Sequence, residues 1–344
     1  MFVAIIGCGQ RNGGKERHAI GYAHAHSWLA ARPDVTLIGV DISPDNLRTF
    51  GDTFKLPSNQ LFASSAELYA AVTPDYVSIC TWPILHSALT IEAAENGVKG
   101  IVCEKPIALN AAEIKAMQEA CEAHNVKLAI GHQRRHDSLF LTLRQLLQEG
   151  AVGEHPVFES RVGDGWDIMS WTVHWFDMAN YLFGKLPERI MAGVDFTGAT
   201  RYRQTVENGS IVFAEYNGTE QAIFITGPDR YHPMVTVRGS RGIMTIEEHL
   251  GTIEVINHEG HRTVTPVHDK PESYQALFLE LVAAVEQNTP MLCDIKETAH
   301  GTLMALAAQE AARTMRAVAY PVDFDYSPLE LARQHLPIQP ESQV

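Results

Sequence analysis

Short apolar runs alternate with helical segments over the first third of the chain. The segments between the runs carry capping-box spacings, such as Ser64 with Glu67 and Asn110 with Glu113. Strands that alternate with helices of this length predict a doubly wound parallel sheet. The apolar runs cover residues 2–6, 36–40, 76–79, 100–103 and 128–130.

From about residue 155 the pattern changes to β-type runs with little helical pattern between the later ones. Asn217-Gly218 stands at hairpin spacing, and apolar positions such as Ile223 and Ile225 alternate with polar ones. This alternation predicts a mostly antiparallel open sheet with helices on one face, while the other face pairs with a second subunit or faces water. Two closing helices are predicted, over residues 273–287 and after Asp294. The β-type runs cover residues 156–162, 188–196, 210–216, 220–226, 234–238, 242–247 and 252–257.

The change of pattern predicts two domains, residues 1–132 with an α/β fold and residues 133–344 with an α+β fold. The net charge of −14 and the lack of a basic block argue against binding of nucleic acid or of an anionic membrane. No apolar run reaches the roughly 18 residues of a membrane span, and no signal peptide is recognised. The five scattered cysteines are typical of reduced thiols, which predicts a cytoplasmic protein.

The first apolar run leads into Gly7-Cys8-Gly9, the start of a dinucleotide-binding Rossmann fold. One glycine allows a tight turn, and the next lets the backbone approach a pyrophosphate at a helix N-terminus. The third glycine of the motif is not in its usual place. We therefore interpret residues 11–20 as an insertion in the phosphate loop, with the helix resuming at Gly21.

Asp41 ends the second apolar run and stands 20 residues after Gly21, where a dinucleotide fold places an acidic residue on the ribose hydroxyls. A carboxylate there repels a 2′-phosphate, so NAD is preferred over NADP. Lys15 or Arg17 of the insertion could still admit a phosphate. The cofactor-binding residues predicted from this region are Gly7, Gly9, Gln10, Gly21 and Asp41.

A charged element, Glu104-Lys105-Pro106, follows the apolar run that ends at Cys103. An acid and a base then lie at the carboxyl end of a strand, where open α/β sheets bind ligands. Pro106 biases Lys105 toward extended backbone geometry, so the backbone sets the direction of the lysine. A surface Glu–Lys pair before a helix is the alternative interpretation.

Five motifs follow one another along the chain. They are Gly7-x-Gly9, Asp41, Thr81-Trp82-Pro83-Ile84-Leu85-His86, Glu104-Lys105-Pro106 and His174-Trp175-Phe176-Asp177. In this order they resemble the glucose–fructose oxidoreductase / inositol dehydrogenase / rhizopine catabolism (Gfo/Idh/MocA) family. The resemblance covers nearly the whole chain and implies NAD(P)-dependent oxidoreduction of sugars, inositols or related polyols. It also implies a homodimer or homotetramer formed through the C-terminal sheet.

The resemblance further implies that Lys105 and His174 flank the nicotinamide and that the motif from Thr81 to His86 lines its pocket. An imidazole titrates near neutral pH, and a buried lysine can have its pKa lowered toward neutrality. Lys105 and His174 are therefore the candidates for taking the proton of a substrate hydroxyl. A capping or core histidine is the alternative for His174. The cofactor-binding residues predicted here are Thr81, Trp82, Pro83, His86, Glu104 and Lys105.

Four residues are predicted to bind substrate. Arg135 follows the last strand of the first domain, where it either binds substrate or forms an interdomain ion pair. Asp177 stands three residues after His174, on one face if the stretch is helical, so it either orients the ring or contacts substrate. Ser170 stands where the family commonly has an aspartate. A carboxylate can come instead from Asp164 or Asp167. The predicted substrate-binding residues are Arg135, Asp167, Ser170 and Asp177.

A metal site is considered for His18, His24 and His26, which crowd the insertion and the helix after it. Cysteine and carboxylate ligands at metal spacing are missing nearby, and His24 and His26 diverge on a helix. No metal is therefore predicted.

Three functions from different classes are compatible with these residues. The leading one is an NAD-dependent dehydrogenase that transfers a hydride between nicotinamide and a ring hydroxyl or ketone of a sugar, inositol or related polyol. The second is NAD-assisted glycoside cleavage through transient oxidation. The third is a non-catalytic NAD-binding regulator, which the serine at position 170 favours.

Overall fold

The chain is folded into two compact units in the computed structural model. The structure describes residues 1–9, 20–163, 166–197, 200–201, 204–227, 234–248, 250–267 and 273–334. The first unit contains Met1–Ala108, Glu113–Gln133 and Glu272–Glu297, and the second contains Leu109–Ala112, Arg134–Pro271 and Thr298–Val344.

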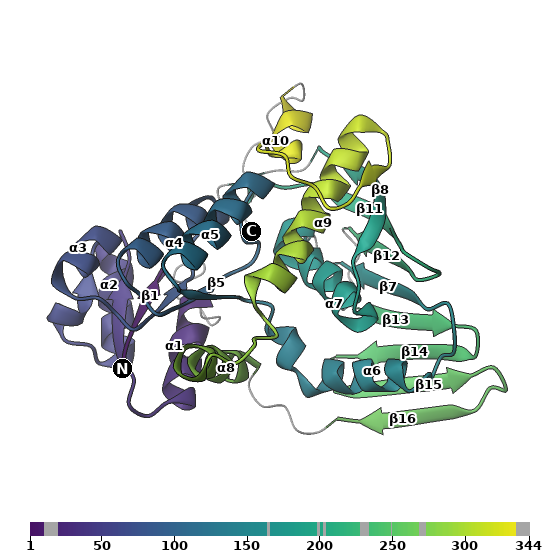
Figure 1. The fold of residues 1–344 in the computed structure, drawn as a ribbon, viewed down its shortest axis with the longest axis horizontal. Helices are drawn as coiled ribbons and strands as arrows, with labels where there is room; N and C mark the ends of the chain where they lie inside the picture. The colour runs from purple at the N-terminus through teal and green to yellow at the C-terminus, as the bar shows by residue number, and fades with distance from the viewer. Residues whose placement is uncertain are drawn as a thin grey trace. The chain divides into compact units, whose positions relative to one another are not determined.

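The first unit is built on a parallel sheet of six strands (Figure 1). The strands are β1 (Phe2–Ile6), β2 (Thr36–Val40), β3 (Leu61–Phe62), β4 (Tyr76–Ile79), β5 (Gly100–Cys103) and β6 (Lys127–Ile130), and the helices α1 (Ile20–Ala31), α2 (Pro44–Phe54), α3 (Ser65–Ala71), α4 (His86–Glu95) and α5 (Ala111–Ala123) follow strands β1 to β5 in turn. The strand order is β3-β2-β1-β4-β5-β6, so the direction of strand addition reverses between β1 and β4. This order confirms the predicted doubly wound sheet.

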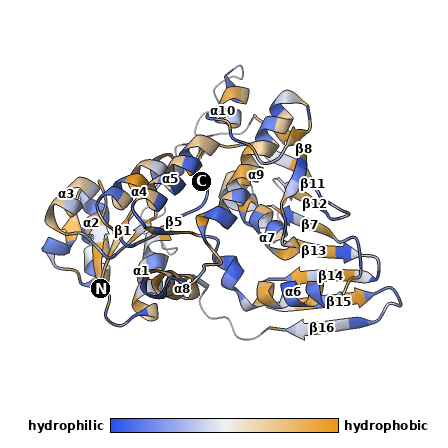
Figure 2. Ribbon diagram, viewed as in Figure 1, coloured by the Kyte–Doolittle hydropathy of each residue, from blue (hydrophilic) through white to orange (hydrophobic). Residues whose placement is uncertain are grey.

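A helix from the far end of the chain completes the core of this unit. β1 is hydrophobic along its length (Figure 2), as expected for a strand covered on both faces. Trp28 of α1 is fully buried, donates a hydrogen bond to Ser78 Oγ at 2.9 Å and stacks on the ring of Phe278 at 4.4 Å. Phe278 belongs to α8 (Ser273–Gln287), which packs against α1. This apolar contact is the reason that α8 joins the first unit, although the predicted boundary at residue 132 assigns it to the second domain.

The second unit is built on a mostly antiparallel sheet of nine strands. Its strands are β7 (Val157–Val162), β8 (Pro187–Asp195), β11 (Gly209–Tyr216), β12 (Gln221–Thr226), β13 (Met234–Gly239), β14 (Gly242–Glu247), β15 (Thr252–Asn257), β16 (Arg262–Pro266) and β17 (Val318–Ala319). The order is β16-β15-β14-β13-β7-β12-β11-β8-β17, and only the central pair β7–β12 is parallel among these described strands. A short pair, β9 (Thr200–Arg201) and β10 (Gln204–Thr205), stands apart, and the helices are α6 (Ser138–Gln148), α7 (Val173–Phe183), α9 (Ile295–Thr314) and α10 (Pro328–Arg333).

The two faces of this sheet have different surroundings. On one face Phe224 of β12 contacts Phe176 of α7 at 4.5 Å, and Tyr216 Oη donates to Asn180 Oδ1 at 2.8 Å. The strand registers align a second set of apolar side chains on the opposite face, and these are exposed. The predicted sheet with helices on one face is confirmed. The exposed set is Met191, Ile211, Met234, Ile256 and Val264.

Candidate active site

Four strands of the first unit deliver residues to one edge of its sheet. Because these strands are parallel, their carboxyl ends share that edge. Gly7 follows β1 and Asp41 follows β2. Thr81 lies just beyond β4, and Glu104 follows β5. The edge includes the switch point between β1 and β4, where a doubly wound sheet binds a dinucleotide.

The glycine turn after β1 leaves no room for side chains. Gly7 has a φ of +102°, and a Cβ atom there would lie 2.6 Å from the carbonyl oxygen of Cys80. A Cβ atom on Gly21 would lie 2.4 Å from the carbonyl oxygen of Gly7. This close approach supports Gly21 as the third glycine of the fold, the one that lets helix and strand pack closely. Gln10 and the insertion residues 11–19 lie outside the described residues.

Asp41 is held by three hydrogen bonds. Its Oδ1 accepts from the backbone N–H of Ser43 at 2.9 Å and from Asn46 Nδ2 at 3.0 Å, and its Oδ2 accepts from the backbone N–H of Cys8 at 2.9 Å. Because Asp41 is half-buried and Oδ2 accepts only one of these bonds, it keeps capacity for a ribose hydroxyl. The glycine turn and this carboxylate therefore have the arrangement with which a dinucleotide fold binds NAD.

The side chain of Glu104 is buried next to the backbone of Lys105. Its Oε1 accepts hydrogen bonds from His24 Nε2 at 3.1 Å and from Tyr274 Oη at 2.8 Å, and its Oε2 accepts from the backbone N–H of Lys105 at 3.2 Å. Burial raises the pKa of Glu104, but the hydrogen bond and charge of His24, helped by Lys105 and Tyr274, outweigh burial and lower it to about 2. Glu104 is therefore a carboxylate at any pH at which the protein works, and it holds the backbone of the half-buried Lys105.

The motif after β4 lies partly in the core and partly at the surface. Trp82 is 41% exposed, which agrees with a side chain available to a ligand, whereas Pro83 is buried. His86 is 1% exposed, with Nδ1 2.9 Å from the carbonyl oxygen of Pro106 and Nε2 3.1 Å from that of Thr81. Burial lowers the pKa of His86. His86 therefore joins the loops that follow β4 and β5 from within the core.

In the second unit, Arg135 and Asp177 form a buried bidentate ion pair. Arg135 Nε donates to Asp177 Oδ2 at 2.9 Å and its second nitrogen donates to Oδ1 at 2.8 Å, with side chains 5% and 2% exposed. Both residues belong to this unit, so the ion pair is not interdomain. Asp177 lies on α7 one turn after His174, which is 3% exposed, so the predicted helical spacing is confirmed.

The neighbouring Arg134 is packed between aromatic rings. Its guanidinium carbon lies 5.3 Å from the ring centre of Trp171 and 5.2 Å from that of Trp175, and it pairs with Glu248 at 3.0 Å. These contacts fix the segment that carries Arg135.

Two buried carboxyl groups contact the loop before α7: Asp167 belongs to this loop, and Glu207 comes from the segment before β11. Asp167 accepts from the backbone N–H of Ser170 at 2.7 Å and from its hydroxyl at 2.7 Å, and so caps the helical turn Ile168–Thr172. Glu207 accepts from the backbone N–H of Ile168. Burial, followed by the charge of Asp167, raises the pKa of Glu207 to about 8, so this side chain is protonated at neutral pH. Asp164 lies outside the described residues.

We expect the Glu207→Gln substitution to change how stability depends on pH. The pKa of Glu207 is about 8 in the folded protein and 4.5 as its ordinary value, so the folded protein binds more protons between these values. The contribution of Glu207 to stability is therefore complete below the ordinary pKa and is lost as the pH rises through 8, by at most about 1.4 kcal/mol per pH unit. Thermal unfolding of the wild type and of Glu207→Gln from acid to mildly alkaline pH measures this. If the stability of the wild type and of Glu207→Gln depended on pH in the same way, Glu207 would not be protonated in the folded protein.

Residues 1–132 match a family described as "Oxidoreductase family, NAD-binding Rossmann fold" (GFO_IDH_MocA). Over 318 residues the chain is 28% identical to inositol 2-dehydrogenase of Rhizobium meliloti (strain 1021), a match that covers 85% of this chain and 92% of that protein. Residues 1–132 therefore form an NAD-binding Rossmann domain of the Gfo/Idh/MocA family.

One further relative and one solved structure are also similar to the chain. The chain is 26% identical to D-apiose dehydrogenase of Paraburkholderia graminis over 287 residues, which cover 76% of this chain and 71% of that protein. Its fold matches the crystal structure of an inositol dehydrogenase homolog complexed with NADH and myo-inositol from Azotobacter vinelandii, with a TM-score of 0.80, 16% identity and coverage of 93% and 97% of the two chains. The family match of residues 1–132 and the similarity to these dehydrogenases show an oxidoreductase that uses NAD, which confirms the predicted class and cofactor.

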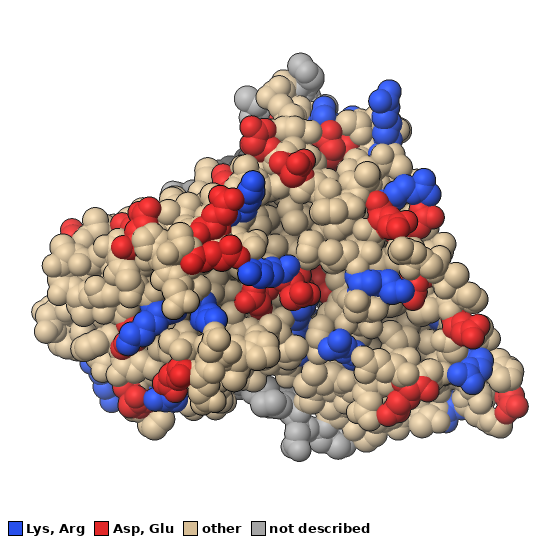
Figure 3. All heavy atoms as spheres, in the orientation of Figure 1, with Lys and Arg blue, Asp and Glu red and all other residues tan. Residues whose placement is uncertain are grey.

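In the part of the chain that the structure describes, no helix is long and apolar enough to cross a membrane. On the face drawn in Figure 3, basic side chains lie among acidic ones. The same described residues contain no group of three His, Cys, Asp or Glu side chains that could hold a metal ion.

Four residues of the site were missed from the sequence. Asn46 stands in the first turn of α2, and its spacing from Asp41 could have indicated the contact. His24 was considered only as a metal ligand, although it follows Gly21 by three residues. Tyr274 and Glu207 carry no local signal, because each reaches its partner from a distant segment.

Proposed function

We propose that this protein is an NAD-dependent dehydrogenase that transfers a hydride between nicotinamide and a ring hydroxyl or ketone of a sugar, inositol or related polyol. The observation that carries the proposal is Lys105, which lies beyond β5 at the sheet edge that also carries the glycine turn and Asp41. Oxidation of an alcohol needs a base beside the dinucleotide, and we assign this role to Lys105.

The proposed proton transfer uses Lys105 and His174. NAD, when bound, supplies the hydride acceptor that side chains cannot provide. We assign to the Lys105 amine and the His174 imidazole the task of taking the hydroxyl proton, and of returning it in the reverse direction. The Arg135–Asp177 pair supports this by restraining α7 one turn beyond His174.

We assign the substrate-binding carboxylate to Asp167, which acts through Ser170. The Ser170 hydroxyl donates a hydrogen bond to Asp167, so the lone pairs of the Ser170 oxygen can accept a hydrogen bond from a substrate O–H. An acceptor that itself donates to a carboxylate is a stronger acceptor. This pairing supports polyol binding despite the serine at the position where the family commonly has an aspartate.

The choice of substrate and cofactor is supported by separate observations. Relatives named inositol 2-dehydrogenase and D-apiose dehydrogenase support a ring polyol as substrate. Asp41 supports NAD over NADP, because a carboxylate beside the ribose repels a 2′-phosphate.

We also propose that the protein forms a homodimer or homotetramer through the open face of the second sheet. The five exposed apolar side chains on that face would be buried in such an interface. All five cysteines are buried and outside any disulfide, which supports a reducing compartment such as the cytoplasm.

The test is turnover of inositols, pentoses and hexoses with NAD and with NADP. We expect NADH to form with at least one polyol and kcat/KM to be higher with NAD than with NADP. Cleavage of a chromogenic glycoside without net NADH would instead indicate NAD-assisted glycoside cleavage. NAD binding with no exchange of the nicotinamide C4 hydrogen for any sugar would instead indicate a regulator.

A further inference from the structure

The carboxylate of Glu104 is a junction between three segments of the first unit. His24 of α1, Tyr274 of α8 and the backbone of Lys105 all donate to it. The fourth side is closed by Gly131 after β6, where a Cβ atom would lie 2.5 Å from Glu104 Oε1. With His24 0% and Glu104 5% exposed, this carboxylate has one orientation, set by the groups around it.

The hydrogen bond from His24 has a defined direction. An ionised carboxylate only accepts, so Nε2 of His24 carries the hydrogen. Nδ1 of His24 is buried and has no hydrogen-bond partner among the described residues. The imidazole packs against the rings of Tyr274 at 4.7 Å and Phe278 at 5.2 Å. The bond to Glu104 is therefore the one polar contact of this side chain within the described part of the chain.

Helix α1 connects this junction to the dinucleotide turn. Gly21 lies against the carbonyl oxygen of Gly7, and His24 follows less than one helical turn later. One short rigid segment therefore contacts the glycine turn at one end and Glu104 at the other. On the far side of Lys105, His86 contacts the carbonyl oxygen of Pro106.

We infer that His24 is a positioning residue for Lys105: it holds the Glu104 carboxylate from α1, and so ties the direction of the lysine to the helix that packs on the dinucleotide turn. The inference rests on the proposed function only in taking Lys105 as the base. Nothing in it requires His24 to touch substrate or cofactor.

The test measures the pH dependence of Lys105 directly. Competitive labelling with acetic anhydride, followed by peptide mass spectrometry, reports the labelling rate of the Lys105 amine against pH and needs no substrate. The charged and titratable groups around Glu104 are His24, His86, Lys105 and Tyr274, together with the thiols of Cys80 and Cys103. Burial raises the pKa of both thiols and lowers the pKa of His86. The variants are His24→Leu, which removes the donor, and His24→Gln, which keeps an N–H donor.

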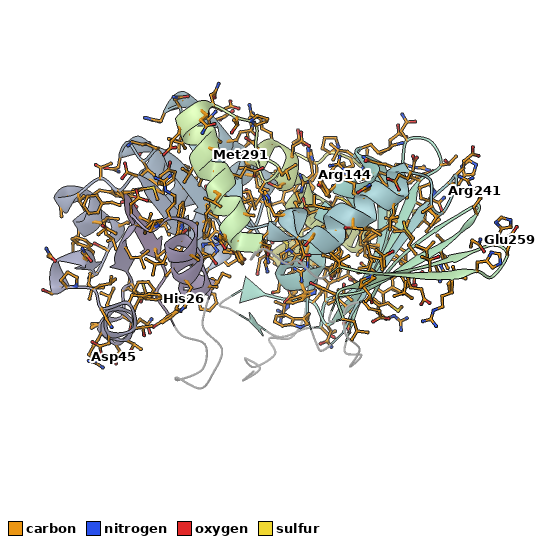
Figure 4. The ribbon with its side chains drawn as sticks, turned by 90° about the horizontal axis from the view of Figure 1, so that it is seen from below. His26, Asp45, Arg144, Arg241, Glu259 and Met291 are labelled. Atoms are coloured by element: carbon orange, nitrogen blue, oxygen red, sulfur yellow. The ribbon has the colours of Figure 1, made fainter. Side chains whose placement is uncertain are left out.

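Two reference variants and one control complete the set. Glu104→Gln removes the negative charge, and Tyr274→Phe removes the other side-chain donor without opening a cavity. His26→Leu is the matched control, because His26 is exposed on the same helix (Figure 4).

We expect Glu104→Gln to lower the pH midpoint of Lys105 labelling by about one unit or more, because an adjacent carboxylate favours the charged amine. His24→Leu should shift it in the same direction and lower kcat about 10- to 100-fold, the effect of losing a hydrogen bond to a charged group. His24→Gln should recover most of the pH midpoint and most of kcat. Tyr274→Phe should shift the pH midpoint of Lys105 labelling less than His24→Leu does. His26→Leu should have the midpoint and kcat of the wild type.

The inference is overturned if the pH midpoint of Lys105 labelling is unchanged in both His24→Leu and Tyr274→Phe. It is also overturned by a His24→Gln variant as impaired as His24→Leu, because packing of the ring would then be what matters. If no polyol is turned over, the proposed function fails while the labelling result still decides the role of His24. If His24→Leu does not fold, Tyr274→Phe tests the same junction in a folded protein.

Discussion

We expect the Lys105→Met variant to retain NAD binding and to have a kcat about 10²- to 10⁴-fold lower than the wild type, the range for loss of a positioned acid–base group. Methionine keeps most of the length and the apolar stem of lysine but has no amine to take a proton. Glu104 still accepts the backbone N–H of residue 105, so the turn after β5 is retained. NADH formation under saturating substrate measures kcat, and calorimetric titration measures NAD affinity.

A lysine at the start of the same strand provides the control. Lys99 pairs with Asp75 at 2.6 Å and its side chain is 61% exposed. The Lys99→Met variant should retain wild-type kcat and lose at most about 1 kcal/mol of stability. Lys105→Met activity within tenfold of the wild type would remove Lys105 from the proton transfer and leave His174 as the base.

The second large effect is expected for Asp177→Asn. This change removes the carboxylate charge that pairs with the buried guanidinium of Arg135, and breaking a buried ion pair of this kind costs about 3–5 kcal/mol. Trp175 lies two residues away, so urea unfolding followed by tryptophan fluorescence reports on this region. We expect the unfolding transition of the second unit to move to lower urea concentration.

A double variant separates loss of the pair from loss of packing. Replacing both partners with apolar residues, Arg135→Met with Asp177→Leu, should recover part of the lost stability, because neither charge is then buried alone. The exposed pair Arg189–Glu215 is the control, and Glu215→Gln should cost at most about 1 kcal/mol. If Asp177→Asn is no less stable than Glu215→Gln, the guanidinium is compensated by another group.

Strands could be predicted where their burial produces an apolar pattern in the sequence. β4 and β5 are fully buried and appear as uninterrupted apolar runs, and the half-buried β12 shows alternation. β16 is largely exposed, so it carries no apolar pattern, and β3 has only two residues. Neither could be recognised from periodicity.

The site residues that could be predicted are the charged ones that directly follow a buried strand. Asp41 and Lys105 follow buried strands of one parallel sheet, so their common edge could be inferred before any coordinates. The groups that hold them could not. Tyr274 is 170 positions from Glu104, and Glu207 is 39 positions from Ile168, so packing alone brings them together.

The place of α8 was not predictable for the same reason. A strand–helix pattern identifies elements but does not say which unit a late helix joins. Phe278 stacks on Trp28 more than two hundred residues earlier, and no periodicity in either helix records that contact.

Asp41 serves two purposes, which limits how the coenzyme preference of this enzyme can be re-engineered. The same carboxylate that we assign to the ribose also accepts hydrogen bonds from Ser43 and Asn46 at the start of α2 and from the backbone of Cys8. Swapping it for a neutral or basic residue to accommodate a phosphorylated coenzyme would loosen this helix start and the glycine turn together. A successful redesign must therefore rebuild those anchors as well as reverse the charge.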